Sequence, residues 1–172
     1  MIMPRGQQLL LPVNPLFIVF TLLLALFINM LPLGRIIWLP DWLMVLLAFW
    51  SLNQPQRVGL GIAFALGLIM DVDRGSLLGQ HAMAYTLLVF VTGWMSRRLL
   101  WFSSPIQALH LLPLFALAHG VQVLLRVAAG GIFPGPWFLL AAVIETLLWP
   151  IVSVLLLAPQ RRAPDSDENR PL

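Results

Sequence analysis

"MDVDRGSLLGQHAMAY", residues Met70–Tyr85, interrupts a chain that is otherwise strongly apolar. Between Asp71 and His81 it contains two aspartates, an arginine, two glycines, a glutamine and a histidine. Long apolar runs flank this segment on both sides. A segment of this kind is a catalytic site, a transport site or a shaped turn between two membrane helices. The composition and spacing of the remaining residues bear on the choice.

The composition indicates an integral membrane protein. Apolar residues make up 60% of the 172 residues and charged residues only 10%, whereas soluble domains carry about 25% charged residues. The ten basic residues are all arginines placed between apolar runs, so the net charge of +3 does not indicate a nucleic-acid-binding face. The absence of cysteine excludes a disulfide framework, a Cys-ligated metal and a thiol nucleophile.

The charge-free runs predict an all-α integral membrane protein, built as a bundle of about six transmembrane helices with short loops. A spanning helix needs about 20 apolar residues. The predicted helices cover residues 15–33, 36–52, 55–73, 77–95, 104–128 and 137–158. Residues 1–158 then form one polytopic transmembrane domain. Residues 159–172, "PQRRAPDSDENRPL", are polar and punctuated by proline, which predicts a disordered cytoplasmic tail.

The distribution of arginines predicts the orientation in the membrane. With six spans both termini lie on one side, together with seven of the ten arginines: Arg5, Arg57, Arg97, Arg98, Arg161, Arg162 and Arg170. The other three are Arg35, Arg74 and Arg126. Because arginines favour the cytoplasmic side, both termini are expected in the cytoplasm. In a bacterial inner membrane the segment Met70–Tyr85 would then face outward.

Small residues recur every four positions along the third predicted helix and lead to Asp71. Such a stripe allows a neighbouring helix to approach to backbone contact. Asp71 is then either a solvated cap at the membrane boundary or a buried carboxylate that ties the third helix to the fourth, and the stripe favours the tie. Beyond it, two glycines allow a tight reversal, and Ser76 is a plausible N-cap of the fourth helix. The predicted packing and interaction residues are Gly59, Ala63, Gly67, Asp71, Gly75, Gly79, Gln80 and His81.

A metal site is the main catalytic alternative for this segment. Asp71, Asp73 and His81 are three potential ligands at close spacing. No HExxH-type pattern supports a metal, and no nucleophile elbow accompanies the nearby serine. The sequence therefore predicts no catalytic residue, no metal and no cofactor.

Glu145 lies deep within the sixth predicted helix, where an unpaired carboxylate is costly. His119 and Arg126 in the fifth helix are the candidate partners for an intramembrane ion pair. A proton or substrate pathway is one interpretation of such a pair, and a purely structural contact is the other. One carboxylate and one histidine make a poor proton relay, so the structural role is favoured.

The stretch from Pro40 to Phe90 resembles the rod shape-determining protein MreD family. The residues that carry the resemblance are Pro40–Trp42, "QPQRVGLG" at Gln54–Gly61, and Asp71–Val72 followed by "GSLLGQHA" at Gly75–Ala82. Asp73 and Arg74 depart from it, since such proteins often carry apolar or aromatic residues there.

The resemblance implies a non-enzymatic component of the bacterial elongation complex. Such proteins work in the inner membrane with MreC, and with MreB, RodA and a penicillin-binding transpeptidase in the same complex, to insert peptidoglycan along the side wall. The implied partners also include membrane lipid and exclude nucleic acid. The segment Met70–Tyr85 is then a shaped outward-facing turn without chemistry of its own.

A more distant likeness to the six-helix substrate-binding subunits of vitamin transporters keeps an alternative open, a small-molecule-binding membrane subunit. An outward pocket lined by Asp71, Gln80, His81 and tryptophans would favour that alternative. A closed, packed interior at this place would favour the scaffold.

Overall fold

The computed structural model describes residues 13–31 and 39–160 of the chain. Within these ranges it contains six α-helices and no β-strand. The helices are α1 (Pro15–Met30), α2 (Trp42–Asn53), α3 (Leu60–Asp73), α4 (Gln80–Leu99), α5 (Ser104–Ala128) and α6 (Phe138–Leu157), followed by the 3₁₀ turn η1 (Ala158–Gln160). The predicted all-α helical bundle is confirmed.

Two predicted helix starts are wrong by about a turn or more. The helix expected to begin at residue 36 begins at Trp42, because the Asp41 side chain accepts a hydrogen bond from the Met44 N–H and caps it there. The helix expected from residue 55 begins at Leu60, because the chain makes a turn in which Gln54 O accepts from Arg57 N and Val58 N. Residues 36–38 lie outside the described residues, as do 32 and 33 at the end of the first predicted helix.

The predicted capping of the fourth helix is also wrong. α4 begins at Gln80 rather than 77, and its N-cap is Gly79, which has a φ of +102°. Ser76 lies in the turn before it and makes its hydrogen bonds to Asp71 instead. At its other end α4 continues to Leu99, four residues beyond the predicted end at 95.

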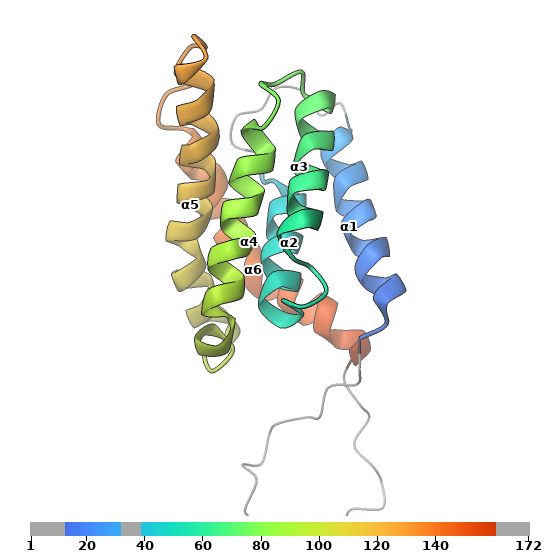
Figure 1. The fold of residues 1–172 in the computed structure, drawn as a ribbon. Coiled ribbons are helices and arrows are strands. Elements are labelled where there is room, and N and C mark those ends of the chain that lie inside the picture. The colour runs from blue at the N-terminus through green and yellow to red at the C-terminus, as the bar shows by residue number, and fades with distance from the viewer. Residues whose placement is uncertain (1–12, 32–38, 161–172) are drawn as a thin grey trace, which may run out of the picture.

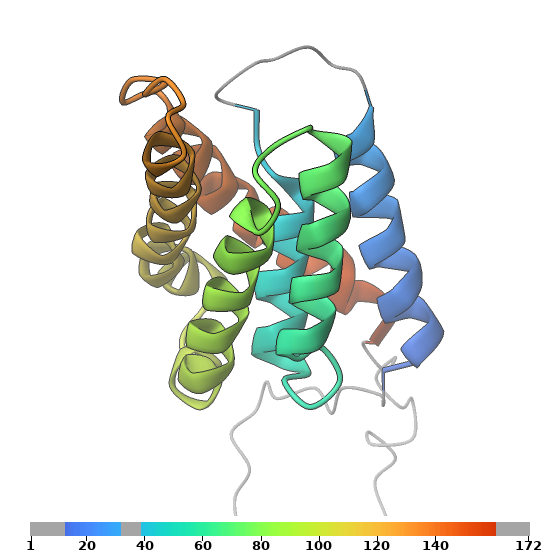
Figure 2. The same ribbon diagram turned by 45° about the horizontal axis from the view of Figure 1, so that its top comes forward.

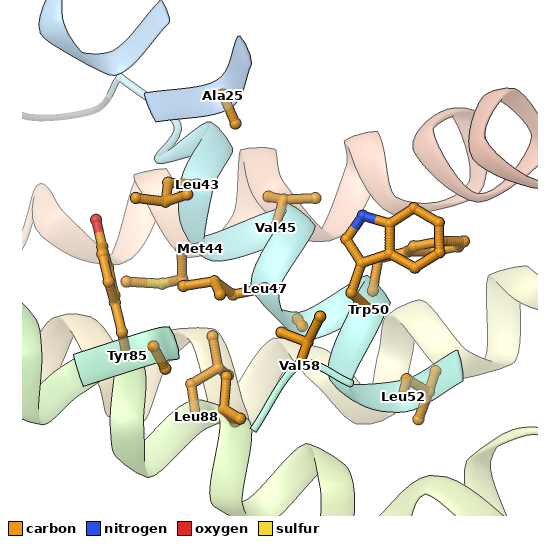
Figure 3. Close-up of a cluster of buried hydrophobic side chains, with 14 of the residues drawn as sticks. Ala25, Leu43, Met44, Val45, Leu47, Trp50, Leu52, Val58, Tyr85 and Leu88 are labelled. Carbon is orange, nitrogen blue, oxygen red and sulfur yellow. The ribbon is translucent and has the colours of Figure 1, made fainter. Parts of the chain in front are cut away.

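The 12-residue helix α2 forms the centre of the bundle. Figures 1 and 2 show α2 inside the bundle, with α1 and α5 on opposite sides and α6 crossing behind it. It packs against α1, α4 and α6, and side chains on all its faces are buried, as expected for a helix that is apolar all round. In Figure 3, Met44 and Leu47 of α2 lie against Tyr85 and Leu88 of α4.

Polar side chains also connect α2 to its neighbours along its length. Trp50 Nε1 donates a hydrogen bond to Thr21 Oγ1 of α1 over 2.9 Å. Ser51 Oγ lies 2.6 Å from Thr92 Oγ1 of α4. Because buried polar groups need partners, these pairs fix the rotation of α2 against both neighbours.

α3 and α4 approach each other to backbone contact. A Cβ added to Gly67 would lie 2.3 Å from Ala82 Cα and 2.6 Å from Ala82 N, so the two backbones touch there. Ala63 on the same stripe is fully buried, whereas a Cβ on Gly59 would meet nothing within 4 Å. Gly75, with a φ of +56°, lies in the turn after α3. The close approach is therefore limited to the half of α3 that leads to Asp71.

The helices differ in length and hydropathy. Ser104–Ala128 and Phe138–Gln160 are long and apolar enough to cross a membrane, and α1 and α2 are apolar but shorter. At 1.5 Å per residue α2 is only about 18 Å long, against a hydrocarbon core of about 30 Å. Large apolar side chains such as Leu16, Phe27 and Trp94 are exposed on the outside of the bundle. Six membrane spans remain a prediction from the sequence.

The α3–α4 contact predicts that Gly67→Leu is destabilising. A leucine at this position has to push the α4 backbone away, and overpacking of this kind costs about 1–3 kcal/mol. Gly61→Leu is the matched control, because a Cβ on Gly61 meets nothing within 4 Å on the same helix. Thermal unfolding of the detergent-purified proteins should show a lower melting temperature for Gly67→Leu alone. Equal melting temperatures would contradict the contact.

Candidate functional site

The carboxylate of Asp71 caps the start of α4 from the end of α3. Oδ1 accepts hydrogen bonds from His81 N at 2.7 Å and Ser76 Oγ at 2.9 Å, and lies 2.8 Å from His81 Nδ1. Oδ2 accepts from Gly79 N at 2.8 Å and, at a longer 3.4 Å, from Ala82 N. α4 has no capping side chain of its own. Asp71 therefore satisfies N–H groups at the start of α4 and places its negative charge at the positive end of the helix dipole.

The residues predicted to act together with Asp71 differ in burial and in their contacts. Asp71 itself is only 1% exposed, and His81 is buried beside it. Gln80 is the first residue of α4 and donates its backbone N–H to Leu77 O. Asp73 at the end of α3 is exposed. In the described part of the chain no three His, Cys, Asp or Glu side chains are grouped so that they could hold a metal ion.

A second polar cluster surrounds the start of α2. It consists of five side chains from five segments of the chain, and we call it the Asp41 cluster: Asn29 of α1, Asp41 at the N-cap of α2, Tyr85 of α4, His119 of α5 and Glu145 of α6. Asp41, His119 and Glu145 are all buried. In Figure 3 the ring of Tyr85 lies beside Leu43 and Met44, in the first turn of α2.

The Asp41 cluster satisfies the backbone N–H groups at the start of α2. Asn29 Oδ1 accepts from Trp42 N at 3.1 Å, and Glu145 Oε1 accepts from Asp41 N at 2.9 Å. Asp41 Oδ1 accepts from Met44 N at 3.0 Å and from Asn29 Nδ2 at 2.6 Å. Asp41 Oδ2 accepts from the Tyr85 hydroxyl. Side chains of α1, α4 and α6 thus converge on one buried helix end.

Glu145 has two carboxylate oxygens in different environments. Oε1 lies 2.9 Å from His119 Nε2 and also accepts from Asp41 N. Oε2 is buried and has no hydrogen-bond partner within the described residues. Of the two partners considered from the sequence, the structure places His119 against Glu145. Arg126 is exposed and forms no ion pair with a described residue.

Asn29 and Tyr85 of the Asp41 cluster carry no signal in the sequence that would have identified them, and Asp41 is marked only as part of Pro40–Trp42, a stretch that carries the resemblance. Asn29 and Tyr85 are isolated polar residues in apolar helices, and Asp41 looks like an ordinary N-terminal helix residue. Asp41 and Glu145 are 104 positions apart in the chain. The one hint in the sequence that Asp41 and Glu145 lie close together is that each is an acidic residue in an apolar segment.

The comparisons agree with the resemblance seen in the sequence. The family described as rod shape-determining protein MreD matches residues 7–158, a range that includes all six helices. This chain belongs to the MreD family. One MreD relative is the "Rod shape-determining protein MreD" of Haemophilus influenzae, which is 32% identical over 135 residues, covering 76% of this chain and 81% of the relative. No solved structure matches the chain.

Both polar clusters include a carboxylate from a stretch that carries the resemblance to the MreD family. The stretch that carries the resemblance, Asp71 to Ala82, is the segment in which Asp71 caps α4. Pro40–Trp42, a second stretch that carries it, contains the N-cap of α2. Two of the three stretches that carry the resemblance therefore hold buried helix starts, whereas the third, Gln54–Gly61, contains the exposed start of α3.

Because each oxygen of Asp71 accepts a hydrogen bond from a backbone N–H group, we predict that Asp71→Asn is destabilising, although aspartate and asparagine have the same shape. An amide has one acceptor oxygen, so its NH₂ group would face the N–H of Gly79 or of His81. Leaving such a buried donor unpaired costs about 1–3 kcal/mol. Asp73→Asn is the control, because Asp73 is exposed on the same helix. Denaturant unfolding in detergent should show the loss for Asp71→Asn only, and equal stability of the two variants would contradict the cap.

For Glu145 we predict that the equivalent change, Glu145→Gln, has little effect on stability. Glu145→Gln keeps an acceptor oxygen for Asp41 N and His119, and its NH₂ takes the place of Oε2, where no described donor opposes it. Glu145→Ala leaves Asp41 N and His119 unpaired, at about 1–3 kcal/mol for each group. In the same unfolding measurement Glu145→Gln should stay close to the parent protein and Glu145→Ala should fall well below it. Two equally unstable variants would show that the carboxylate charge itself is required.

Proposed function

We propose that this chain is a non-enzymatic inner-membrane component of the rod complex, where it organises lateral-wall peptidoglycan synthesis together with MreC. MreB, RodA and a penicillin-binding transpeptidase belong to the same proposed complex. Membership of the MreD family supports the role in rod-shape determination. The observation that carries the scaffold role is the internal use of Asp71, whose two oxygens bond to Ser76, His81 and the backbone of α4.

The same observation weighs against the alternative role as a small-molecule-binding subunit. That role needs the outward polar residues to line a pocket. Asp71 and His81 instead contact each other, and both are buried. Ligand pockets expose a few polar groups that fix the ligand, whereas both oxygens of Asp71 and Nδ1 of His81 bond within the protein. The scaffold is the function that their geometry favours.

We also propose the topology and domain division expected from the arginines. Residues 1–158 form the transmembrane domain with both termini in the cytoplasm, and 159–172 form the tail. Arg57, Arg97 and Arg98 lie at one end of the bundle and Arg74 at the other, in keeping with this orientation. The tail residues 161–172 and Arg5 lie outside the described residues, while Ala158–Gln160 form the turn η1.

The proposed function predicts rescue of cell shape together with contact to MreC. Expressed in a rod-shaped bacterium that lacks its own MreD, this chain should restore rod cells. A photocrosslinking residue at Phe64 or Val72, which are exposed on α3, should capture MreC. The same residue at the buried Met70 should not.

Two outcomes would contradict separate parts of this proposal. Round cells at a normal level of membrane-inserted protein would contradict the role in rod shape. Restored rods without capture of MreC from any exposed position on α3 or α4 would contradict the partnership. Microscopy and immunoblotting of the crosslinked membranes separate the two results.

A further inference from the structure

α3 and α4 diverge from their contact at Gly67 towards the other end of the bundle, as Figures 1 and 2 show. A Cβ on Gly59 would meet nothing within 4 Å, and one on Gly93 would reach Pro55 and Ser51 only at 4.0 Å. The space between the helices forms a groove of about 280 Å³ lined by Val58, Gly59, Leu60, Phe90, Gly93 and Trp94, among others. We call it the α3–α4 groove.

The lining of the α3–α4 groove selects the kind of ligand that it can hold. Its walls are apolar side chains and glycines, with no charged side chain among them. Binding sites for small molecules span roughly 300–1,000 Å³ and add polar groups that orient the ligand. A groove that is slightly smaller and almost wholly apolar suits part of a hydrocarbon chain better than a compact polar metabolite.

Two exposed arginines of α4, Arg97 and Arg98, lie next to the groove residue Trp94. Arg57 precedes the lining residue Val58, and Arg97 and Arg98 follow Trp94 by three and four positions, which places them beside Trp94 on the surface of α4. Arg57 Nη1 donates to Val13 O over 2.6 Å, which directs its guanidinium towards the start of α1 and away from α4. Arg97 and Arg98 are exposed. The four acidic residues of the described part all lie towards the opposite end of the bundle: Asp41, Asp71, Asp73 and Glu145.

Trp94 marks the level at which the apolar and the charged parts meet. It is 76% exposed, and exposed tryptophans in membrane proteins lie at the level of the lipid headgroups. Phe90, one turn deeper along α4, lies beside the groove on the apolar side of Trp94, and the arginines lie on its polar side. The order of apolar wall, tryptophan and arginine is the order of acyl chain, interface and phosphate in a phospholipid.

We propose that the α3–α4 groove binds one anionic phospholipid, with an acyl chain against Phe90, Gly59 and Gly93 and the phosphate held by Arg97 or Arg98. The groove supplies shape for the chain and the arginines supply charge for the headgroup. Because these arginines lie at the end expected in the cytoplasm, the lipid comes from the inner leaflet.

The test is native mass spectrometry of the full chain released from nanodiscs that contain equal amounts of phosphatidylglycerol and phosphatidylcholine. The parent protein should retain one phosphatidylglycerol. Gly93→Leu, which fills the groove, should lose it, whereas Gly61→Leu, the same change on the open outer face of α3, should keep it. Arg97→Gln should weaken retention about five-fold, or about 1 kcal/mol, whereas Arg126→Gln at the other end of the bundle should have no effect.

The outcomes that overturn the proposal are distinct. Equal retention of phosphatidylcholine would show that charge plays no part. Unchanged phosphatidylglycerol retention in Gly93→Leu would place the lipid elsewhere. Displacement by soluble glycerol phosphate would show an anion site that needs no chain. A photocrosslinker at Phe90 that captures a protein and no lipid in cell membranes would assign the groove to a partner helix.

Discussion

The buried start of α2 is the constraint on which the rest of the bundle depends. A helix begins with N–H groups that have no partner within the helix, and leaving them unpaired away from water is costly. α2 lies at the centre of the fold, so its first turn cannot turn to solvent. The side chains of Asn29, Asp41 and Glu145 supply the acceptors. The positions of α1 and α6 follow from this requirement, and those of α4 and α5 follow through Tyr85 and His119.

The start of α4 is also capped by a buried carboxylate, here from a single side chain. Asp71 is a carboxylate from the preceding helix that accepts hydrogen bonds from the first N–H groups of the next. The close contact of Gly67 with Ala82 brings the two helices near enough for this bond. A bulky residue on the stripe would separate them, so the small residue and the carboxylate act together. Both buried carboxylate sites thus place negative charge at the positive end of a helix.

The buried acidic residues bond within the protein, so the groups that remain free to bind other molecules lie on the surface of the protein. The buried acids contact helix starts and histidines, and the outside of the bundle presents apolar side chains and a few arginines. This arrangement supports the proposal that the chain acts through what it binds at its surface, partner helices or lipid. That fits the rod shape-determining family to which the chain belongs.

The sequence alone determined the helical class and the approximate place of all six helices, and it favoured the tie between Asp71 and α4 over a solvated cap. These depend on local patterns: charge-free runs, a four-residue stripe of small residues, and a glycine-rich turn. The starts of α2 and α3 were misplaced, because an apolar run does not reveal where a cap or a proline turn begins the helix. Only the tertiary structure decided that Asn29, Tyr85 and Glu145 all bond to Asp41, and that His119 rather than Arg126 is the partner of Glu145. These contacts join residues far apart in the chain, and what selects them is the need of one buried helix end for acceptors, which no local spacing records.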